Sequence, residues 1–182
     1  MDNGKLTADV ARKLSKKFGT RAEILFDHGD PEKDGKDQVG VIRSWFGDKL
    51  ARDFLLADVD IAVVLPNSNQ VLALVEIEES SASPKTLLGD VFATLFGDHI
   101  IFQGKRELLV DERTTLIVLS RGGSRQVITH LNKILASQQN EQTKNSCIHR
   151  IIIDTFDKSN LEQKLTRVIE DAIANQQSKI KN

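Results

Sequence analysis

The alternation of apolar and polar residues along the chain predicts helices and strands in turn. In residues 6–18 an apolar residue recurs every four positions, as expected for one buried face of a helix. Residues 38–52 show a weaker form of this spacing. Clear helical spacing recurs further along, over residues 84–96, 127–135 and 159–173. Short runs rich in Val, Ile and Leu predict strands over residues 21–26, 57–65, 71–78, 114–119 and 148–153.

Two of these strands, residues 57–65 and 71–78, are joined by turn-forming residues and predict a β-hairpin. The middle of the first strand is apolar on both of its side-chain faces, which is typical of a strand buried on both sides. Strands that alternate with helices favour a sheet covered by helices. We therefore expect one α/β domain over residues 1–182, with a mixed central β-sheet flanked by helices on both faces and a polar tail, residues 175–182, that frays.

Composition narrows the class of protein. The chain is 40% hydrophobic and 28% charged, a balance that supports one globular core with a solvated surface. We expect a soluble, cytoplasmic protein without a membrane partner, because no apolar run approaches the roughly 20 residues of a membrane helix and no secretory signal pattern opens the chain. The lone Cys147 excludes an internal disulfide and a Cys-rich zinc site. A net charge of −1 leaves contact with phosphate to local basic patches.

Four acidic residues lie on the two strands of the predicted hairpin. A turn centred on Ser68 would place Asp60 opposite Glu76 and Asp58 opposite Glu78. Since side chains alternate between faces along a strand, all four carboxylates would project from one face. Opposed Cβ atoms lie about 4.5 to 5.5 Å apart, a separation at which like charges destabilise a sheet. A hard cation such as Mg²⁺ would neutralise them; alternatively, one or two of the four lie beyond the sheet in solvent.

The residues around this hairpin resemble a known family. Asp60-Ile61-Ala62-Val63-Val64, a turn, Val75-Glu76-Ile77-Glu78 and a following helix resemble the core of the PD-(D/E)xK, or restriction-endonuclease-like, nuclease superfamily. That superfamily has a core of order α-β-β-β-α-β, with an Asp at the start of one strand and an acidic-x-Lys triplet on its hairpin partner. The resemblance covers roughly residues 54–96 and implies that Asp60 and Glu76 bind the metal.

The chain departs from this family at one position. Glu78 stands where the family usually has Lys. The resemblance implies that Glu78 acts as a base or a further ligand, and Lys85, in the following helix, could supply the missing positive charge. The implied activity is hydrolysis of phosphodiester bonds in DNA by a restriction or repair-type endonuclease that uses Mg²⁺ (or Mn²⁺), with a homodimer as one possible assembly. Because Glu78 replaces the usual Lys, a protein that is related to these nucleases but lacks their activity is an alternative.

Two other functions remain open. The strand Asp58-Val59-Asp60 also resembles the D-x-D strand of polymerase-β-like nucleotidyltransferases, although the Gly-Ser pair of those enzymes is missing upstream. A non-catalytic module that binds nucleic acid or protein on a nuclease fold is the third hypothesis. Basic residues near Arg12 and Arg106 support a nucleic-acid partner weakly. The four histidines show no metal-ligand spacing, and no role is predicted for them.

Overall fold

The computed structural model describes residues 4–47, 55–79, 84–97, 99–121, 125–138, 148 and 150–180. Within these ranges the strands form a five-stranded sheet of order β1-β4-β5-β8-β9 and a four-stranded sheet of order β3-β2-β6-β7. The larger sheet consists of β1 (Glu23–Phe26), β4 (Ile61–Val64), β5 (Val71–Glu78), β8 (Thr115–Arg121) and β9 (Arg150–Phe156). The smaller sheet consists of β2 (Ile42–Trp45), β3 (Leu55–Val59), β6 (His99–Phe102) and β7 (Arg106–Leu108). The helices are α1 (Lys5–Phe18), α2 (Pro31–Asp34), α3 (Pro84–Leu95), α4 (Arg125–Gln138) and α5 (Leu161–Ile180).

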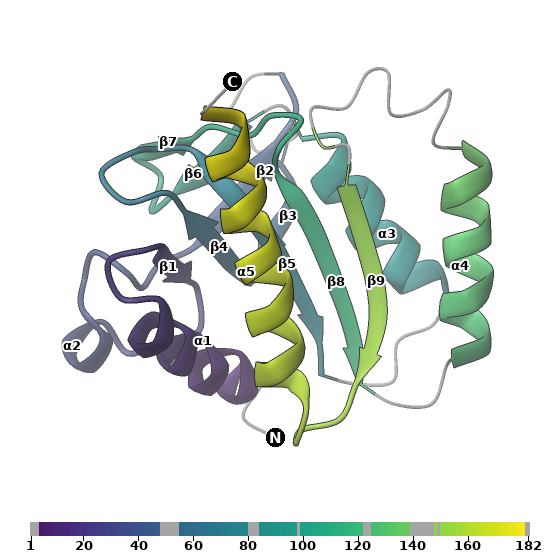
Figure 1. The fold of residues 1–182 in the computed structure, drawn as a ribbon, viewed down its shortest axis with the longest axis horizontal. Coiled ribbons are helices and arrows are strands. Elements are labelled where there is room, and N and C mark those ends of the chain that lie inside the picture. The colour runs from purple at the N-terminus through teal and green to yellow at the C-terminus, as the bar shows by residue number, and fades with distance from the viewer. Residues whose placement is uncertain are drawn as a thin grey trace.

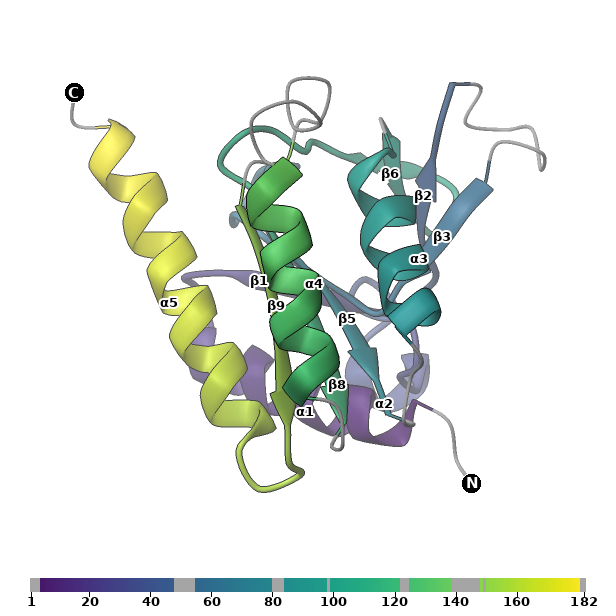
Figure 2. The same cartoon turned by 90° about the vertical axis from the view of Figure 1, so that its right-hand side faces the viewer.

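The larger sheet is mixed and lies between two layers of helices, as the sequence predicts (Figure 1). Its strand β4 runs antiparallel to both β1 and β5, whereas β5, β8 and β9 run parallel to one another. Leu14 of α1 and Leu165 of α5 belong to the hydrophobic core on one face, and Leu87 of α3 and Leu131 of α4 belong to the core on the other. Figure 2 shows α5 and α3 on opposite sides of the sheet.

The predicted hairpin forms with the predicted register. Ile61 lies opposite Val75 and Val63 lies opposite Ala73, which is the register expected for a turn centred on Ser68; a bulge between Val63 and Val64 then places Val64 opposite Val71. All residues of β4 are fully buried. The reason is that alternate side chains enter different cores: Val63 packs on the α1 and α5 side, and Val64 on the other.

The prediction is wrong where the first strand of the hairpin begins. Residues 57–65 do not form one strand, because the chain breaks at Asp60 and the preceding β3 pairs with β2 in the smaller sheet. The helix expected over residues 38–52 is also wrong in its described part, where β2 is a strand. Ile42 and Ser44 are buried while Arg43 between them is exposed, as the alternation of side chains in a strand allows; Trp45, which follows a register shift, is buried too.

Other helical predictions are confirmed. The helix predicted over residues 6–18 is α1, and it ends before Gly19, whose positive φ of 51° is accessible to glycine. The helix α5 extends to Ile180, through most of the tail for which the sequence favours fraying. None of the described helices is both long and apolar enough to cross a membrane.

Candidate metal centre

Three strand ends of the larger sheet meet at one edge. Since β4 runs antiparallel to both β1 and β5, it begins where those two strands end. Asp27 and His28 directly follow β1, Asp60 directly precedes β4, and Glu78 is the last residue of β5. Asp27 also donates its backbone N–H to the backbone oxygen of Asp60 at 3.2 Å. The topology therefore brings acidic side chains and an imidazole from distant parts of the chain to a single place.

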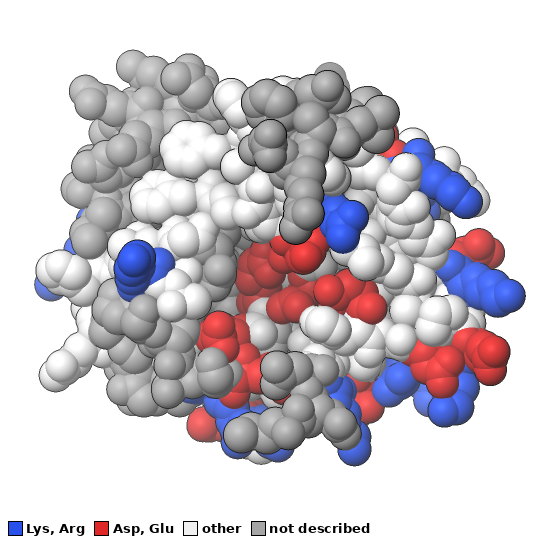
Figure 3. All heavy atoms as spheres, turned by 180° about the vertical axis from the view of Figure 1, so that it is seen from behind, with Lys and Arg blue, Asp and Glu red and all other residues white. Residues whose placement is uncertain are grey.

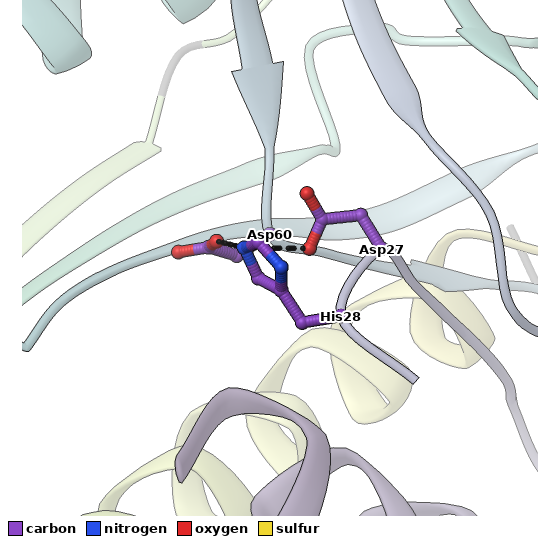
Figure 4. Close-up of side chains that lie close together, drawn as sticks. All are labelled: Asp27, His28 and Asp60. Carbon is purple, nitrogen blue, oxygen red and sulfur yellow. Dashed lines mark ion pairs between the residues drawn. The ribbon is translucent and has the colours of Figure 1, made fainter. Parts of the chain in front are cut away.

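Asp27, His28 and Asp60 form a compact cluster of potential metal ligands. One ligand atom from each lies within 4.8 Å of the others. In the described part of the chain, this is the one group of at least three His, Cys, Asp or Glu side chains placed so closely. The imidazole Nε2 of His28 lies 3.2 Å from Asp27 Oδ1 and 3.7 Å from Asp60 Oδ1. Figure 4 shows this nitrogen directed between the two carboxylates. The three side chains could share one ion.

Asp60 is oriented by the backbone around it. Its Oδ2 accepts a hydrogen bond of 2.6 Å from the backbone N–H of Ile77, in β5, while Oδ1 faces His28. Burial raises the pKa of Asp60 to about 7; the Ile77 hydrogen bond opposes this shift, and the charge of Asp27 adds to it. The carboxylate is thus held in a fixed position where its negative charge is poorly solvated.

Asp27 meets a similar environment. Burial raises the pKa of this carboxyl group to about 6, against the opposing charge of His28. Its Oδ1 is buried, and apart from His28 Nε2 at 3.2 Å it has no hydrogen-bond partner among the described residues. Buried carboxylate oxygens usually have more complete partners. A cation placed between Asp27 and Asp60 would stabilise both carboxylates in their charged forms, so the residues present fit a divalent ion.

The cluster opens into a pocket of about 230 Å³. The described residues that line this pocket are Gly4, Thr7, His28, Asp60, Ile77, Glu78 and Glu79. Glu79 accepts hydrogen bonds from the backbone N–H and the hydroxyl of Thr7 at 3.2 and 3.3 Å, and it thereby joins the start of α1 to the end of β5. The side chain of His28 is 42% exposed, so the cluster is accessible from solvent.

Acidic side chains gather near the centre of one face of the molecule. Figure 3 shows Asp and Glu atoms in the central hollow of this face, with Lys and Arg side chains mainly toward its margins. The negative potential of such an area would repel a polyanion unless cations offset it.

Comparisons with known proteins leave the family open. No family model, no curated protein and no solved structure matches this chain. The function is therefore argued from the geometry of the site and from the arrangement of the strands that carry it.

The acids predicted from the sequence have different surroundings. Asp60 belongs to the cluster, and Glu78 lines the same pocket. Glu76 is buried instead, and its Oε1 accepts a hydrogen bond of 2.9 Å from the hydroxyl of Thr94, in α3. It is not a member of the three-residue cluster. The structure thus brings Asp60 and Glu78 to one pocket and turns the carboxylate of Glu76 toward the helix.

Two further predicted residues lie outside the cluster. The predicted pairing of Asp58 with Glu78 is wrong, because β3 belongs to the smaller sheet, where Asp58 lies opposite Arg43 and its Oδ1 accepts a 3.1 Å hydrogen bond from the Arg43 guanidinium. Lys85 is exposed in the first turn of α3 and is not among the described residues that line the pocket.

Asp27 and His28 were missed by the sequence analysis. Their signal is an Asp-His pair directly after a predicted strand, and it becomes meaningful only once that strand is known to pair with the strand that follows Asp60. Phe26 lies opposite Ile61 in this pairing. The pairing joins segments about 35 positions apart, which local patterns do not reveal.

The loop that follows His28 is anchored on two sides. Arg12 of α1 binds Asp34 through two hydrogen bonds of 2.7 and 2.8 Å. On the other side, the amide of Gln103 donates to the backbone oxygens of Lys36 and Val39 at 2.6 and 2.8 Å. These contacts hold the backbone that carries the cluster, as a preorganised site requires. They also show that Arg12 already has an acidic partner.

Proposed function

We propose that the protein is a divalent-metal-dependent hydrolase that cleaves phosphodiester bonds in nucleic acid, with DNA as its substrate. The observation that carries this proposal is the position of Asp60, at the edge of the sheet where Asp27, His28 and Glu78 also converge. Oxygen and imidazole ligands around an accessible pocket are suited to metal-assisted hydrolysis.

The order of the elements supports the same proposal. Taken along the chain, α1, β1, β4, β5, α3 and β8 follow the α-β-β-β-α-β order of the PD-(D/E)xK nuclease core. The smaller sheet arises from two insertions in this order: β2 and β3 come between β1 and β4, and β6 and β7 come between α3 and β8. Asp60 directly precedes β4, the first strand of the hairpin. The resembled superfamily has its metal-binding Asp at the start of the corresponding strand.

The residues of the pocket can be assigned distinct roles. A bound divalent ion supplies a water molecule of lowered pKa and stabilises negative charge on the phosphate oxygens. Asp27 and Asp60 would hold this ion through their Oδ1 atoms. Glu78, on the wall of the same pocket, would accept the proton of the attacking water as a general base. Glu76, hydrogen-bonded to Thr94, would keep the end of β5 in place against α3.

Positive charge for the substrate would come from residues near the same edge. Lys85 opens the helix that follows β5, and Arg121 ends β8, whose Ser120 lies beside Glu78. Both side chains are exposed. Contacts from such residues to backbone phosphates would orient the nucleic acid without reading its sequence.

The test is cleavage of DNA by purified protein. Supercoiled plasmid, linear duplex, single-stranded DNA and RNA are incubated with Mn²⁺ or Mg²⁺ and with a chelator. We expect nicked or linear plasmid only when a divalent ion is present. Asp60→Ala should reduce the rate by more than about 100-fold, since even residues that only orient metal ligands contribute 10- to 100-fold. No product from any of these substrates in the presence of either ion would refute the proposal.

The chain offers a matched control for this experiment. Asp58 is also acidic and close to Asp60 in the sequence, but it lies on β3 beside Arg43. Asp58→Ala should therefore cleave DNA at the wild-type rate. Incubation of the same variants with a nucleoside triphosphate and an acceptor tests the nucleotidyltransferase alternative, because that activity requires Asp58 and Asp60 together and would be lost in both variants.

A non-catalytic nucleic-acid-binding module is the second candidate. The observation that favours it is Glu78, which occupies the position where active nucleases of the resembled superfamily usually have Lys. This candidate predicts DNA binding in a gel-shift assay together with the absence of cleavage, whereas the hydrolase predicts both. Glu78→Lys would separate the two further, since it should create cleavage only if the fold is that of a nuclease.

A further inference from the structure

The imidazole of His28 distinguishes this cluster from a site made of carboxylates alone. We infer that His28 ligates the ion through Nε2 together with Asp27 and Asp60, and that the site therefore selects a divalent transition-metal ion such as Mn²⁺ over Mg²⁺. The inference rests on the proposed function only in placing an ion at Asp60. It assigns a role to a residue for which the sequence predicted none.

The distances fit three ligands of one ion. Ligand atoms about 2.1 Å from an octahedral ion are about 3 Å apart when adjacent and about 4.2 Å apart when opposite. His28 Nε2 lies 3.2 Å from Asp27 Oδ1 and 3.7 Å from Asp60 Oδ1, and all three atoms lie within 4.8 Å of one another. Small rotations of the side chains would bring the three atoms to bonding distance of a common centre.

The chemistry of the donor set then decides the type of ion. Mg²⁺ prefers oxygen ligands and retains several waters, whereas imidazole nitrogen suits transition metals. A set of one imidazole and two carboxylates binds the ions later in the first transition row more strongly than Mg²⁺. His28 should therefore raise affinity for Mn²⁺, Co²⁺ and Zn²⁺ and contribute little to Mg²⁺.

Asp27 adds to the case for an ion. Its side chain is 12% exposed, and its buried Oδ1 lies 3.2 Å from His28 Nε2 and accepts no further hydrogen bond from the described residues. A carboxylate oxygen with one such contact still has capacity to bind a cation. A metal ion bound to Oδ1 would therefore offset a charge that is poorly hydrated.

The fold also keeps the imidazole in place. Gly4, at the start of α1, lies against the ring of His28, and a Cβ atom added to Gly4 would be 2.2 Å from the His28 Cγ. Gly4 has a φ of +84°, a conformation that favours glycine. The absence of a side chain at Gly4 thus allows α1 to approach the imidazole, and the approach restricts where the ring can lie.

The competing explanation is that a protonated His28 offsets both carboxylates as an ion pair, with no metal involved. Metal binding separates the two explanations. The protein of residues 1–182 is freed of metal by chelation and titrated calorimetrically with Mn²⁺ and Mg²⁺. Co²⁺ is used as a spectroscopic probe, because its visible absorption changes when a nitrogen ligand is replaced by water.

We expect wild-type protein to bind Mn²⁺ at least about 10-fold more tightly than Mg²⁺. His28→Gln should weaken Mn²⁺ binding by about 10- to 100-fold, alter the Co²⁺ spectrum and leave Mg²⁺ binding unchanged. The matched control is His99→Gln, because His99 pairs with Glu107 in the smaller sheet, outside the cluster. This variant should bind both ions as the wild type does.

Three results would overturn the inference: no binding of any of the ions, equal affinity of the wild type for Mn²⁺ and Mg²⁺, or full Mn²⁺ affinity in a folded His28→Gln variant. Circular dichroism verifies folding, and the exposed position of His28 makes the substitution tolerable. The result is distinguishable from that of the cleavage test. Binding of Mn²⁺ through His28 without cleavage would refute the hydrolase alone, whereas cleavage that depends on Asp60 but not on His28 would refute this inference alone.

Discussion

The backbone N–H of Ile77 donates a hydrogen bond of 2.6 Å to Oδ2 of Asp60. This bond joins the point where the chain leaves the smaller sheet to the end of β5, and it turns Oδ1 of Asp60 toward His28. Oδ2 of Asp60 is thus hydrogen-bonded to the backbone of the larger sheet, and Oδ1 faces the other residues of the cluster.

The metal-free protein should lose stability as the pH rises from about 4 to above 7. Burial raises the pKa of Asp60 to about 7 and that of Asp27 to about 6, above the ordinary value of about 3.9 in the unfolded chain. In this range the folded state therefore holds more protons than the unfolded state, so the free energy of unfolding falls with increasing pH. Urea denaturation in the presence of a chelator measures the slope.

Asp60→Asn should remove much of this slope. The amide oxygen of Asn can still accept the Ile77 hydrogen bond, but it carries no charge to desolvate. We expect the variant to be more stable than the wild type at pH 8, on the order of 2 kcal/mol, and nearly equal to it at pH 4. Asp58→Asn, at an exposed position beside Arg43, is the control. A wild-type pH slope in Asp60→Asn would contradict the buried-charge account of this site.

Addition of Mn²⁺ should reverse the destabilisation of the wild type at neutral pH. At an ion concentration 100 times the dissociation constant, binding contributes about 2.7 kcal/mol to the free energy of unfolding. For a chain of this length this raises Tm by roughly 5 to 10 °C. Thermal melts should show the rise in wild-type protein and its absence in Asp60→Asn and Asp27→Asn.

The same melts test the metal role that the sequence predicts for Glu76. Because Glu76 is buried and hydrogen-bonded to Thr94, we expect Glu76→Gln to lower Tm in metal-free protein but to retain the Mn²⁺-dependent rise. Loss of that rise in a folded Glu76→Gln variant would show instead that Glu76 is a ligand.

Gly4→Ala should weaken Mn²⁺ binding without any change to a ligand. The added Cβ would collide with the ring of His28, and the positive φ of Gly4 adds backbone strain. Gly19→Ala is the matched control, because Gly19 also has a positive φ but its Cβ would meet nothing within 4 Å. Both variants should lose about 1 kcal/mol or more of stability, and only Gly4→Ala should lose Mn²⁺ affinity in calorimetry. Equal affinities in the two variants would exclude a positioning role for Gly4.

Arg106 should matter for stability and not for binding of nucleic acid. Its guanidinium makes two hydrogen bonds of 2.9 Å to Glu23 and one of 2.7 Å to the backbone oxygen of Ser68. These bonds join the smaller sheet to the hairpin turn of the larger one. Arg106→Ala should cost about 2 to 3 kcal/mol in urea denaturation, since it leaves a half-buried carboxylate unpaired.

Lys105→Ala, at the exposed neighbouring position, should leave stability unchanged. Gel shifts with duplex DNA should give equal affinities for wild-type protein and folded Arg106→Ala. A selective loss of DNA binding in Arg106→Ala would contradict this prediction. It would show that Arg106 contacts nucleic acid, as the basic residues around it suggest.

The hairpin could be predicted from the sequence because its signals lie within a few neighbouring residues. Five turn-forming residues separate two short apolar runs, and both faces of the strand before the turn are apolar, so only one register places Val63 and Ala73 opposite each other in the core. The register does not fix where the first strand begins, and the break at Asp60 was not predicted. The helices α1, α3, α4 and α5 were also accessible, because a single apolar stripe repeats at helical spacing in each.

The smaller sheet was not accessible in the same way. The strand β2 has only four residues, and its burial does not alternate regularly because Ser44 and Trp45 are both buried, so the pattern does not separate a strand from a helix. Its partners β3 and β6 come from different parts of the chain, and the pairing of Arg43 with Asp58 is what removes Asp58 from the predicted acidic face.

Local patterning of the chain thus determined the α/β class and the hairpin with its register, because turn residues and apolar spacing act over a few positions. Only the tertiary structure decided which side chains accompany Asp60. The antiparallel pairing of β1 with β4 brings Asp27 and His28 to it, and the break before β4 takes Asp58 away. These choices depend on packing between distant segments, where the burial of whole strands outweighs any local preference.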